Sequence, residues 1–134
     1  MKTPKTNLSR NGSSSRTLIY VVDDEPMLLE LANVILAPLG YHVKTFRNPE
    51  AALNAFGAEK PHPALVITDY SMHTMNGLDL IEACRRIEPK QKFLMISGTV
   101  DQHVYRDSRW KPNQFLSKPY QTKELVEAVE ALLT

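Results

Sequence analysis

Polar side chains directly follow four of the five apolar runs in this 134-residue sequence. They are three carboxylates, one hydroxyl and one ammonium group, on Asp23, Asp24, Asp69, Ser97 and Lys118. Gathered carboxylates repel one another, which costs stability unless a cation lies among them or a proton is taken up. Mg²⁺ matches best, because it takes one or two carboxylates and leaves a coordination position for a phosphoryl oxygen. With a carboxylate nucleophile, a hydroxyl and an ammonium group nearby, the set suits phosphoryl transfer onto an aspartate.

Each of these residues also has a purely structural explanation. Adjacent aspartates after a strand often form a turn and a helix cap, and Ser97 before Gly98 can simply begin a turn. A single lysine is usually solvated. Zinc is disfavoured, because the histidines at 42, 62, 73 and 103 have no paired spacing with Cys84. The prediction of a site therefore depends on the convergence of all five side chains.

The apolar runs alternate with amphipathic stretches, giving strand then helix five times. This order predicts a parallel sheet with helices on both faces, and such sheets bind ligands at the carboxyl ends of their strands. The expected strands are 18–22, 43–46, 64–68, 93–96 and 115–116. The expected helices begin at Pro26, at Pro49 after an Asn48 cap, after Gly77, within 100–110 as a weak helix, and after a Thr122 cap.

The apolar spacing also predicts which helix faces are buried. The buried stripes are Leu28, Leu31, Ile35 and Leu36 in the first helix, Leu80, Ile81, Cys84 and Ile87 in the third, and Leu125, Val126, Val129, Leu132 and Leu133 in the last. Pro38 is expected to cut the first helix short before Gly40, and Gly57 is expected to stop the second.

Composition limits the class of protein. The chain is 43% apolar and 23% charged with a net charge of +1, which describes one soluble domain and disfavours a nucleic-acid binder. The single cysteine excludes an internal disulfide, and no apolar stretch is long enough to span a membrane. A cytoplasmic protein is therefore expected.

Residues 1–16 differ in composition from the rest. They carry four basic residues and no acidic one, whereas 17–134 carries twelve basic and fifteen acidic residues. The Ser-rich stretch 7–16 has one apolar residue, so a disordered tail is expected ahead of a domain at 17–134, with an ordered extension as the alternative. Such a tail can be a solubilising leader, or it can contact phosphates or an acidic partner.

Four short motifs occur in a specific order. VVDDEP at 21–26, VITDYSM at 66–72, SGT at 97–99 and FLSKPY at 115–120 resemble the receiver domain of two-component response regulators, the CheY-like family. Gly77, eight positions after Asp69, belongs to the same pattern, and the resemblance covers about 17–134. It implies a flavodoxin-like, doubly wound (βα)5 fold with strand order 2-1-3-4-5, which would place the aspartates at the switch point between the first and third strands.

The resemblance implies a role for each residue of the acidic site. Asp69 would accept the phosphoryl group from a histidine kinase or a histidine phosphotransfer protein. Asp24 and Asp69 would bind Mg²⁺ directly, Asp23 through water, and Ser71 through its backbone carbonyl. Ser71 and Thr99 would flank the attacking water. Both are small and neutral, which predicts an intermediate lifetime for the phosphoryl group.

Further residues are implied in switching. Ser97 would report phosphorylation through its hydroxyl, and Phe115 would move inward in response, with ordinary strand packing as the alternative for Phe115. Lys118 would form an ion pair with a phosphoryl oxygen and would precede a cis peptide bond to Pro119.

The output surface is expected on the fourth helix, the fifth strand and the fifth helix. There Tyr105, Trp110 and Tyr120 are candidate anchors for an unidentified downstream protein, with core packing as the alternative for Trp110. A monomer or a phosphorylation-dependent dimer is expected, without direct contact to nucleic acid or membrane. No output module follows the last helix, so the domain either acts alone or was cut from a longer regulator or hybrid kinase.

The sequence departs from the family pattern at three places. His73 stands where proline is usual, and Pro38 falls in the last turn of the first helix. Lys-Pro-Asn at 111–113 replaces the usual Gly-Ala ahead of the fifth strand. The first change is expected to leave its loop more mobile, and the last is expected to affect the geometry of the output surface.

Two other functions fit part of the pattern. One is a degenerate receiver that serves only as a protein-binding domain, although all five site positions carry competent side chains. The other is a magnesium-dependent phosphohydrolase with an aspartyl nucleophile. Such enzymes commonly have a second aspartate two residues after the first, where this chain has Glu25 after Asp23 and Asp24, and they need a cap domain or longer loops.

Overall fold

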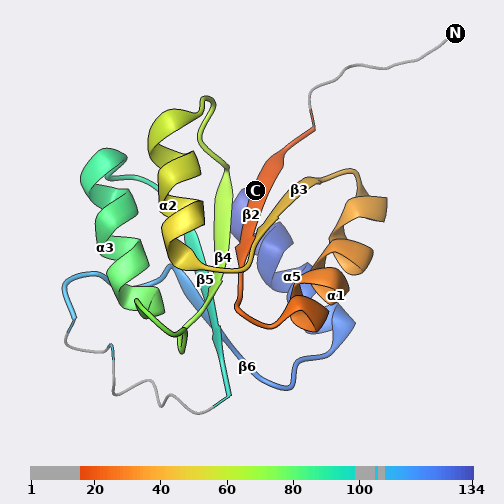
Figure 1. The fold of residues 1–134 in the computed structure, drawn as a ribbon. Coiled ribbons are helices and arrows are strands. Elements are labelled where there is room, and N and C mark those ends of the chain that lie inside the picture. Colours follow the sequence, from red (N-terminus) through yellow and green to blue (C-terminus); the bar gives the residue numbers. More distant parts are fainter. Residues whose placement is uncertain (1–15, 99–104, 106–107) are drawn as a thin grey trace, which may run out of the picture.

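The computed structural model describes residues 16–98, 105 and 108–134, in which five apolar runs form five parallel strands. The strands are β2 (Leu18–Val22), β3 (His42–Phe46), β4 (Leu65–Asp69), β5 (Phe93–Ser97) and β6 (Gln114–Ser117). Their order across the sheet is β3-β2-β4-β5-β6 (Figure 1), which confirms the predicted 2-1-3-4-5 arrangement. Every residue of β4 and β5 is buried, as unbroken apolar runs predict for strands covered on both faces.

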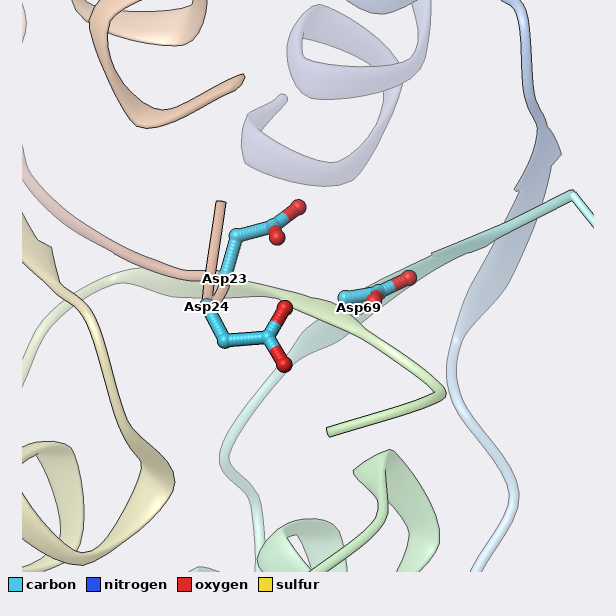
Figure 2. Close-up of side chains that lie close together, drawn as sticks. All are labelled: Asp23, Asp24 and Asp69. Carbon is cyan, nitrogen blue, oxygen red and sulfur yellow. The ribbon is translucent and has the colours of Figure 1, made fainter. Parts of the chain in front are cut away.

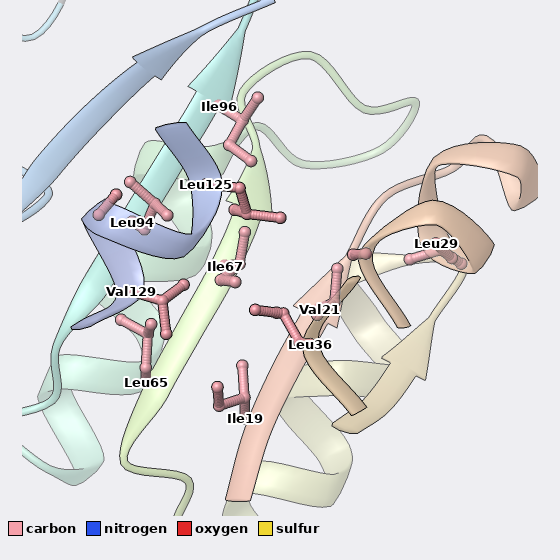
Figure 3. Packing of buried hydrophobic residues seen from close by; sticks show 12 residues of the cluster. Ile19, Val21, Leu29, Leu36, Leu65, Ile67, Leu94, Ile96, Leu125 and Val129 are labelled. Atoms are coloured by element: carbon pink, nitrogen blue, oxygen red, sulfur yellow. The ribbon is translucent and has the colours of Figure 1, made fainter. Parts of the chain in front are cut away.

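Helices cover both faces of this sheet (Figure 1). In the described part of the chain they are α1 (Pro26–Leu36), α2 (Pro49–Ala58), α3 (Gly77–Ile87) and α5 (Thr122–Leu133). Side chains of α1 and α5 pack on one face with Ile19 and Val21 of β2, as Figure 3 shows. Those of α2 and α3 pack on the other face with Tyr20 and Val22. The alternation of side chains along β2 therefore contributes to both cores.

Local sequence signals set several helix boundaries as predicted. The Asn48 side chain accepts a hydrogen bond from the Ala51 amide at 2.8 Å at the start of α2. After the last residue of α1, Pro38 lies in a short 3₁₀ turn, η1 (Ala37–Leu39). Gly40 follows with φ of 100°, a left-handed conformation that glycine adopts at low cost.

The predicted buried stripe of α1 was partly wrong. Leu29, Ala32 and Leu36 are the buried residues, whereas Leu31 is 41% exposed and Leu28 is half-buried. Apolar residues occur nearly all round this helix, so periodicity alone does not select the face that meets the sheet.

Three other helix predictions were also wrong. The helix α2 continues through Gly57, because this glycine is not in the left-handed conformation that would end a helix. Gln121, rather than Thr122, precedes α5, and the Glu124 side chain accepts from the Gln121 amide at 2.7 Å. Ile87 is 47% exposed because it is the last residue of α3.

The Lys-Pro-Asn segment ahead of β6 is tied to α3 by Arg85. The Arg85 guanidinium donates to the Lys111 carbonyl at 2.6 Å and to Asn113 Oδ1 at 2.8 Å. The same Asn113 oxygen accepts from the Phe93 amide at 2.8 Å. These contacts fix the entry to β6, and Trp110 packs half-buried against the α2–α3 core beside them.

Two predictions fall mainly outside the described residues, namely the disordered tail at 1–16 and the weak helix at 100–110. Among the helices that are described, none has the length and apolar character needed to cross a membrane.

Candidate functional site

Three carboxylates meet at the carboxyl ends of β2 and β4, which are neighbours in the sheet (Figure 2). One side-chain oxygen from each of Asp23, Asp24 and Asp69 lies within 4.8 Å of the others. Asp23 and Asp69 are 7% and 8% exposed, and Asp24 is half-buried. The predicted convergence of these three residues is therefore observed.

Backbone hydrogen bonds hold the two acidic strand ends in place. The Asp23 amide donates to the Phe46 carbonyl at 3.1 Å, and Asp23 Oδ1 accepts from the Glu25 amide at 2.9 Å. On the other strand, the Tyr70 amide donates to the Ile96 carbonyl at 3.0 Å. The backbone at Asp23 and directly after Asp69 is therefore bonded to a neighbouring strand.

Lys118 brings a positive charge into the acidic cluster. Its Nζ lies 3.2 Å from Asp69 Oδ1 and 3.5 Å from Asp23 Oδ2. The Lys118 amide donates to the Ser97 carbonyl at 3.0 Å, which holds the residue against the end of β5. The peptide bond from Lys118 to Pro119 is cis, as predicted.

Burial dominates the electrostatics of the cluster. It raises the pKa of Asp23 and of Asp69 above the ordinary carboxyl value, and the Lys118 charge only partly opposes this. Burial also acts to lower the pKa of Lys118, but attraction to Asp23 and Asp69 outweighs it, so that pKa is raised. The cluster thus contains more buried negative charge than one ammonium group compensates.

The donor atoms fit a hard divalent cation. All three side chains offer carboxylate oxygens, which are the ligands that Mg²⁺ prefers. The raised pKa values of Asp23 and Asp69 show that burial makes their ionisation costly, and a bound cation would relieve that cost.

The other predicted site residues lie around this cluster. Ser97 is 3% exposed at the end of β5, in register with Ser117 of β6. Ser71 is exposed in the loop after β4. Phe115 is half-buried in β6, with its ring tilted against that of Tyr105 at 5.7 Å between centroids. The candidate at position 99 lies outside the described residues.

One contact at the site was not predicted. His73 Nδ1 lies 3.0 Å from Asp24 Oδ2, with the histidine side chain 89% exposed. In the sequence this histidine stands at a position where proline is usual, but no spacing rule connects it with Asp24, which lies 49 positions earlier in the chain. Only the packing of the β4–α3 loop brings the two together.

Residues 19–130 match the response regulator receiver domain family. The chain belongs to this family. The receiver domain acts in two-component signalling. The response regulator receiver protein CpdR of Brucella abortus is 30% identical over 119 residues, covering 88% of this chain and 97% of that protein. A CheY-like receiver domain protein from Methanospirillum hungatei has the same fold, with a TM-score of 0.81 and 23% identity over 89% of this chain and 94% of that one.

Other relatives are longer proteins. The alkaline phosphatase synthesis transcriptional regulatory protein SphR of Synechococcus elongatus is 30% identical over 131 residues, covering 90% of this chain but 50% of that protein. The DNA-binding response regulator MtrA of Mycolicibacterium smegmatis is 29% identical over 118 residues, covering 88% of this chain and 51% of that protein. This chain therefore spans about half the length of both relatives.

The raised pKa values predict a pH-dependent effect of neutralising Asp69. A folded-state pKa above the unfolded value means that the folded chain holds protons more tightly, so the free energy of unfolding falls as pH rises through that window. We expect metal-free Asp69→Asn to be more stable than the wild type at neutral pH, by on the order of 1 kcal/mol. The gain should shrink as pH falls toward the ordinary aspartate pKa.

Urea unfolding in EDTA over a pH series measures this effect. Glu30→Gln, which neutralises an exposed carboxylate on α1, is the control and should show no comparable gain. A gain for Asp69→Asn that does not change with pH, or a loss of stability at neutral pH, would contradict the role of burial.

Proposed function

We propose that Asp69 accepts a phosphoryl group from a histidine kinase or a histidine phosphotransfer protein, and that phosphorylation changes the output surface expected on the predicted fourth helix, β6 and α5. The observation that carries this proposal is the cluster itself. Three carboxylates lie within 4.8 Å of one another, and Lys118 Nζ is 3.2 Å from Asp69 Oδ1. A nucleophile, a cation-binding group and a fixed positive charge are thus adjacent.

The residues that would hold Mg²⁺ are Asp24 and Asp69 directly, Asp23 through water, and the Ser71 backbone carbonyl. When bound there, Mg²⁺ supplies positive charge that neutralises the oxygens of the transferring group. The all-oxygen donor set of the three aspartates supports this choice of cation.

In the transfer itself, a carboxylate oxygen of Asp69 forms a bond to phosphorus as the phosphorus–nitrogen bond of a donor phosphohistidine breaks. The electron pair of that bond returns to the donor imidazole nitrogen, which then takes up a proton from solvent. Lys118 stabilises the negative charge of the phosphoryl oxygens from its place between Asp23 and Asp69. The chain's contribution is mainly positioning and charge.

The switch would begin at Ser97. Its hydroxyl donates to a phosphoryl oxygen, which draws the end of β5 toward Asp69. Ser97 is in register with Ser117 of β6, and Phe115 lies two residues earlier on that strand. A shift of Ser97 can therefore reach the Phe115 side chain through paired backbone and alter the surface for a downstream protein.

We further propose that the domain works in the cytoplasm, as a monomer or a phosphorylation-dependent dimer, without itself binding nucleic acid or membrane. SphR, named as a transcriptional regulatory protein, and MtrA, named as a DNA-binding response regulator, are about twice as long as this chain. This chain matches the receiver domain family, so in this proposal the output activity belongs to a partner or to further sequence.

Phosphorylation with acetyl phosphate, followed by mass spectrometry of the intact chain and its peptides, tests the proposal. We expect one phosphoryl group, located on Asp69, whose incorporation requires Mg²⁺ and stops in EDTA. Asp69→Asn should incorporate none, while Glu30→Gln, at an exposed position on α1, should label as the wild type does. Labelling of another residue, or equal labelling in EDTA, would contradict the proposal.

A beryllofluoride phosphate mimic separates this function from that of a receiver used only for binding. With Mg²⁺ present, the mimic should change the environment of Phe115 and the neighbouring Tyr105, which is measurable by NMR. An unmoved spectrum in a chain that also takes up no label would favour the binding-only receiver.

A further inference from the structure

We propose that His73 supplies an imidazole nitrogen to the cation site beside Asp24. The site would then bind a borderline transition-metal ion such as Co²⁺ more tightly, relative to Mg²⁺, than its carboxylates alone would. The inference rests on the proposed function in one respect, because it assumes a cation among Asp23, Asp24 and Asp69. It concerns a residue that is not part of the receiver motifs.

The distance between the two side chains is that expected for two ligands of one ion. His73 Nδ1 lies 3.0 Å from Asp24 Oδ2. Two ligands bound at about 2.1 Å and at right angles on an octahedral ion are about 3.0 Å apart. An ion on Asp24 Oδ2 therefore needs no large movement of the histidine to gain a nitrogen ligand.

The loop that carries His73 is anchored at both ends. On one side the Tyr70 amide donates to the Ile96 carbonyl, and on the other the Gly77 amide donates to the Tyr70 carbonyl at 2.8 Å. Between them the Thr74 hydroxyl donates to the Glu50 carboxylate. These bonds attach the loop to β5 and to α2. The greater mobility expected from the loss of proline stays a prediction.

Exposure makes the histidine available to an ion from solvent. The His73 side chain is 89% exposed and that of Asp24 is 23% exposed. The side chains of Asp23 and Asp69 are less than half as exposed as that of Asp24, at 10% and 9%. The two residues thus form the outer, solvent-facing side of the cluster. A nitrogen ligand there would take the place of a water on the cation rather than of a protein oxygen.

The kind of donor sets the consequence for selectivity. Mg²⁺ prefers oxygen ligands, while imidazole suits later divalent ions, whose affinity for mixed nitrogen and oxygen sites rises from Mn²⁺ through Co²⁺ to Cu²⁺. A histidine added to three carboxylates therefore raises the affinity for Co²⁺ more than that for Mg²⁺.

The other described histidines provide matched controls. His42 begins β3, at the end of the sheet opposite the acidic cluster. His62 is stacked on Phe56, with ring centroids 4.2 Å apart, and its Nε2 is 3.2 Å from Lys60 Nζ. Neither is placed to reach an ion at Asp24.

Titration of the full chain with Co²⁺ and with Mg²⁺ by calorimetry tests the inference. We expect His73→Gln to lower the ratio of Co²⁺ to Mg²⁺ affinity by about tenfold, while His42→Gln leaves it unchanged. Gln is chosen because it can still hydrogen-bond to Asp24 but is a poor metal ligand.

A spectroscopic readout identifies the ligand directly. In the Co²⁺-loaded wild type, proton NMR should show paramagnetically shifted ring signals of one histidine, and these should be lost in His73→Gln. Their absence in the wild type, or an unchanged affinity ratio in His73→Gln, would overturn the inference while leaving the Mg²⁺ site intact. If instead the wild type binds neither ion, or Asp24→Asn binds both as well as the wild type, the proposed cation site itself fails.

Discussion

Replacing Lys118 with methionine should slow phosphoryl transfer to Asp69 by about a hundredfold to a thousandfold, the usual effect of removing one preorganised charge or donor from a transition state. Lys118 Nζ lies 3.2 Å from Asp69 Oδ1 and 3.5 Å from Asp23 Oδ2. Of the described residues, it is the one cation at ion-pair distance from Asp69. Methionine keeps a similar length and apolar stem but removes the charge that meets the phosphoryl oxygens.

The same substitution should strengthen Mg²⁺ binding, because Lys118 and the cation compete for the carboxylates of Asp23 and Asp69. Slower phosphoryl transfer together with tighter Mg²⁺ binding distinguishes loss of charge from misfolding, because misfolding would lower both the rate and the affinity. The rate is measured with acetyl phosphate at saturating Mg²⁺, and the affinity by calorimetry.

Lys123→Met is the matched control for this prediction. Lys123 lies on α5, where its exposed side chain is 3.9 Å from Glu127, and the substitution should leave the rate unchanged. A rate for Lys118→Met within a few-fold of the wild type, or equal effects of the two substitutions, would show that Lys118 does not stabilise the transferring group.

The parallel sheet and the polar residues at its strand ends could be predicted from one-dimensional features, whereas the strand order was implied by the resemblance to the receiver family. Unbroken apolar runs mark strands buried on both faces, and parallel pairing brings the ends of such strands to one edge of the sheet. The three aspartates lie at or directly after the ends of such strands in the sequence, namely Asp23, Asp24 and Asp69. Their proximity could therefore be predicted without knowledge of side-chain packing.

Features that depend on packing could not be predicted in the same way. The buried face of α1 was misplaced because Leu28, Leu29 and Leu31 are all apolar, and only the fit against the sheet selects Leu29. The contacts of Arg85 with the segment ahead of β6 join residues 26 and 28 positions apart through loop geometry. The periodicity of apolar residues does not predict such hydrogen bonds.

Gly77 illustrates a residue whose importance is geometric, and its replacement should have a large effect. A Cβ at this position would lie 2.8 Å from the Asp69 carbonyl oxygen, 3.0 Å from Met95 Sδ and 3.2 Å from Tyr70 Cα. Two of these atoms are backbone at the end of β4, so the clash cannot be relieved by turning a side chain. We expect Gly77→Ala to cost about 1–3 kcal/mol of stability, as overpacking of a core does.

The same substitution should also slow phosphorylation, because Asp69 lies on the backbone that must move. A displacement of about 1 Å in a reacting group can lower a rate by about a hundredfold. The free energy of unfolding is measured with urea, and the rate with acetyl phosphate under conditions where the variant remains folded. A loss of stability without a change in rate would show that the end of β4 is not displaced.

Gly57→Ala provides a control of opposite sign. Gly57 lies inside α2, and a Cβ there would meet only Ile87 Cδ1 at 3.8 Å, which is an ordinary contact. Alanine is favoured over glycine in a helix by roughly 0.5–1 kcal/mol, so this variant should be more stable than the wild type. If Gly77→Ala were as stable as Gly57→Ala, the close approach of α3 to the Asp69 backbone would not be what requires glycine at that position.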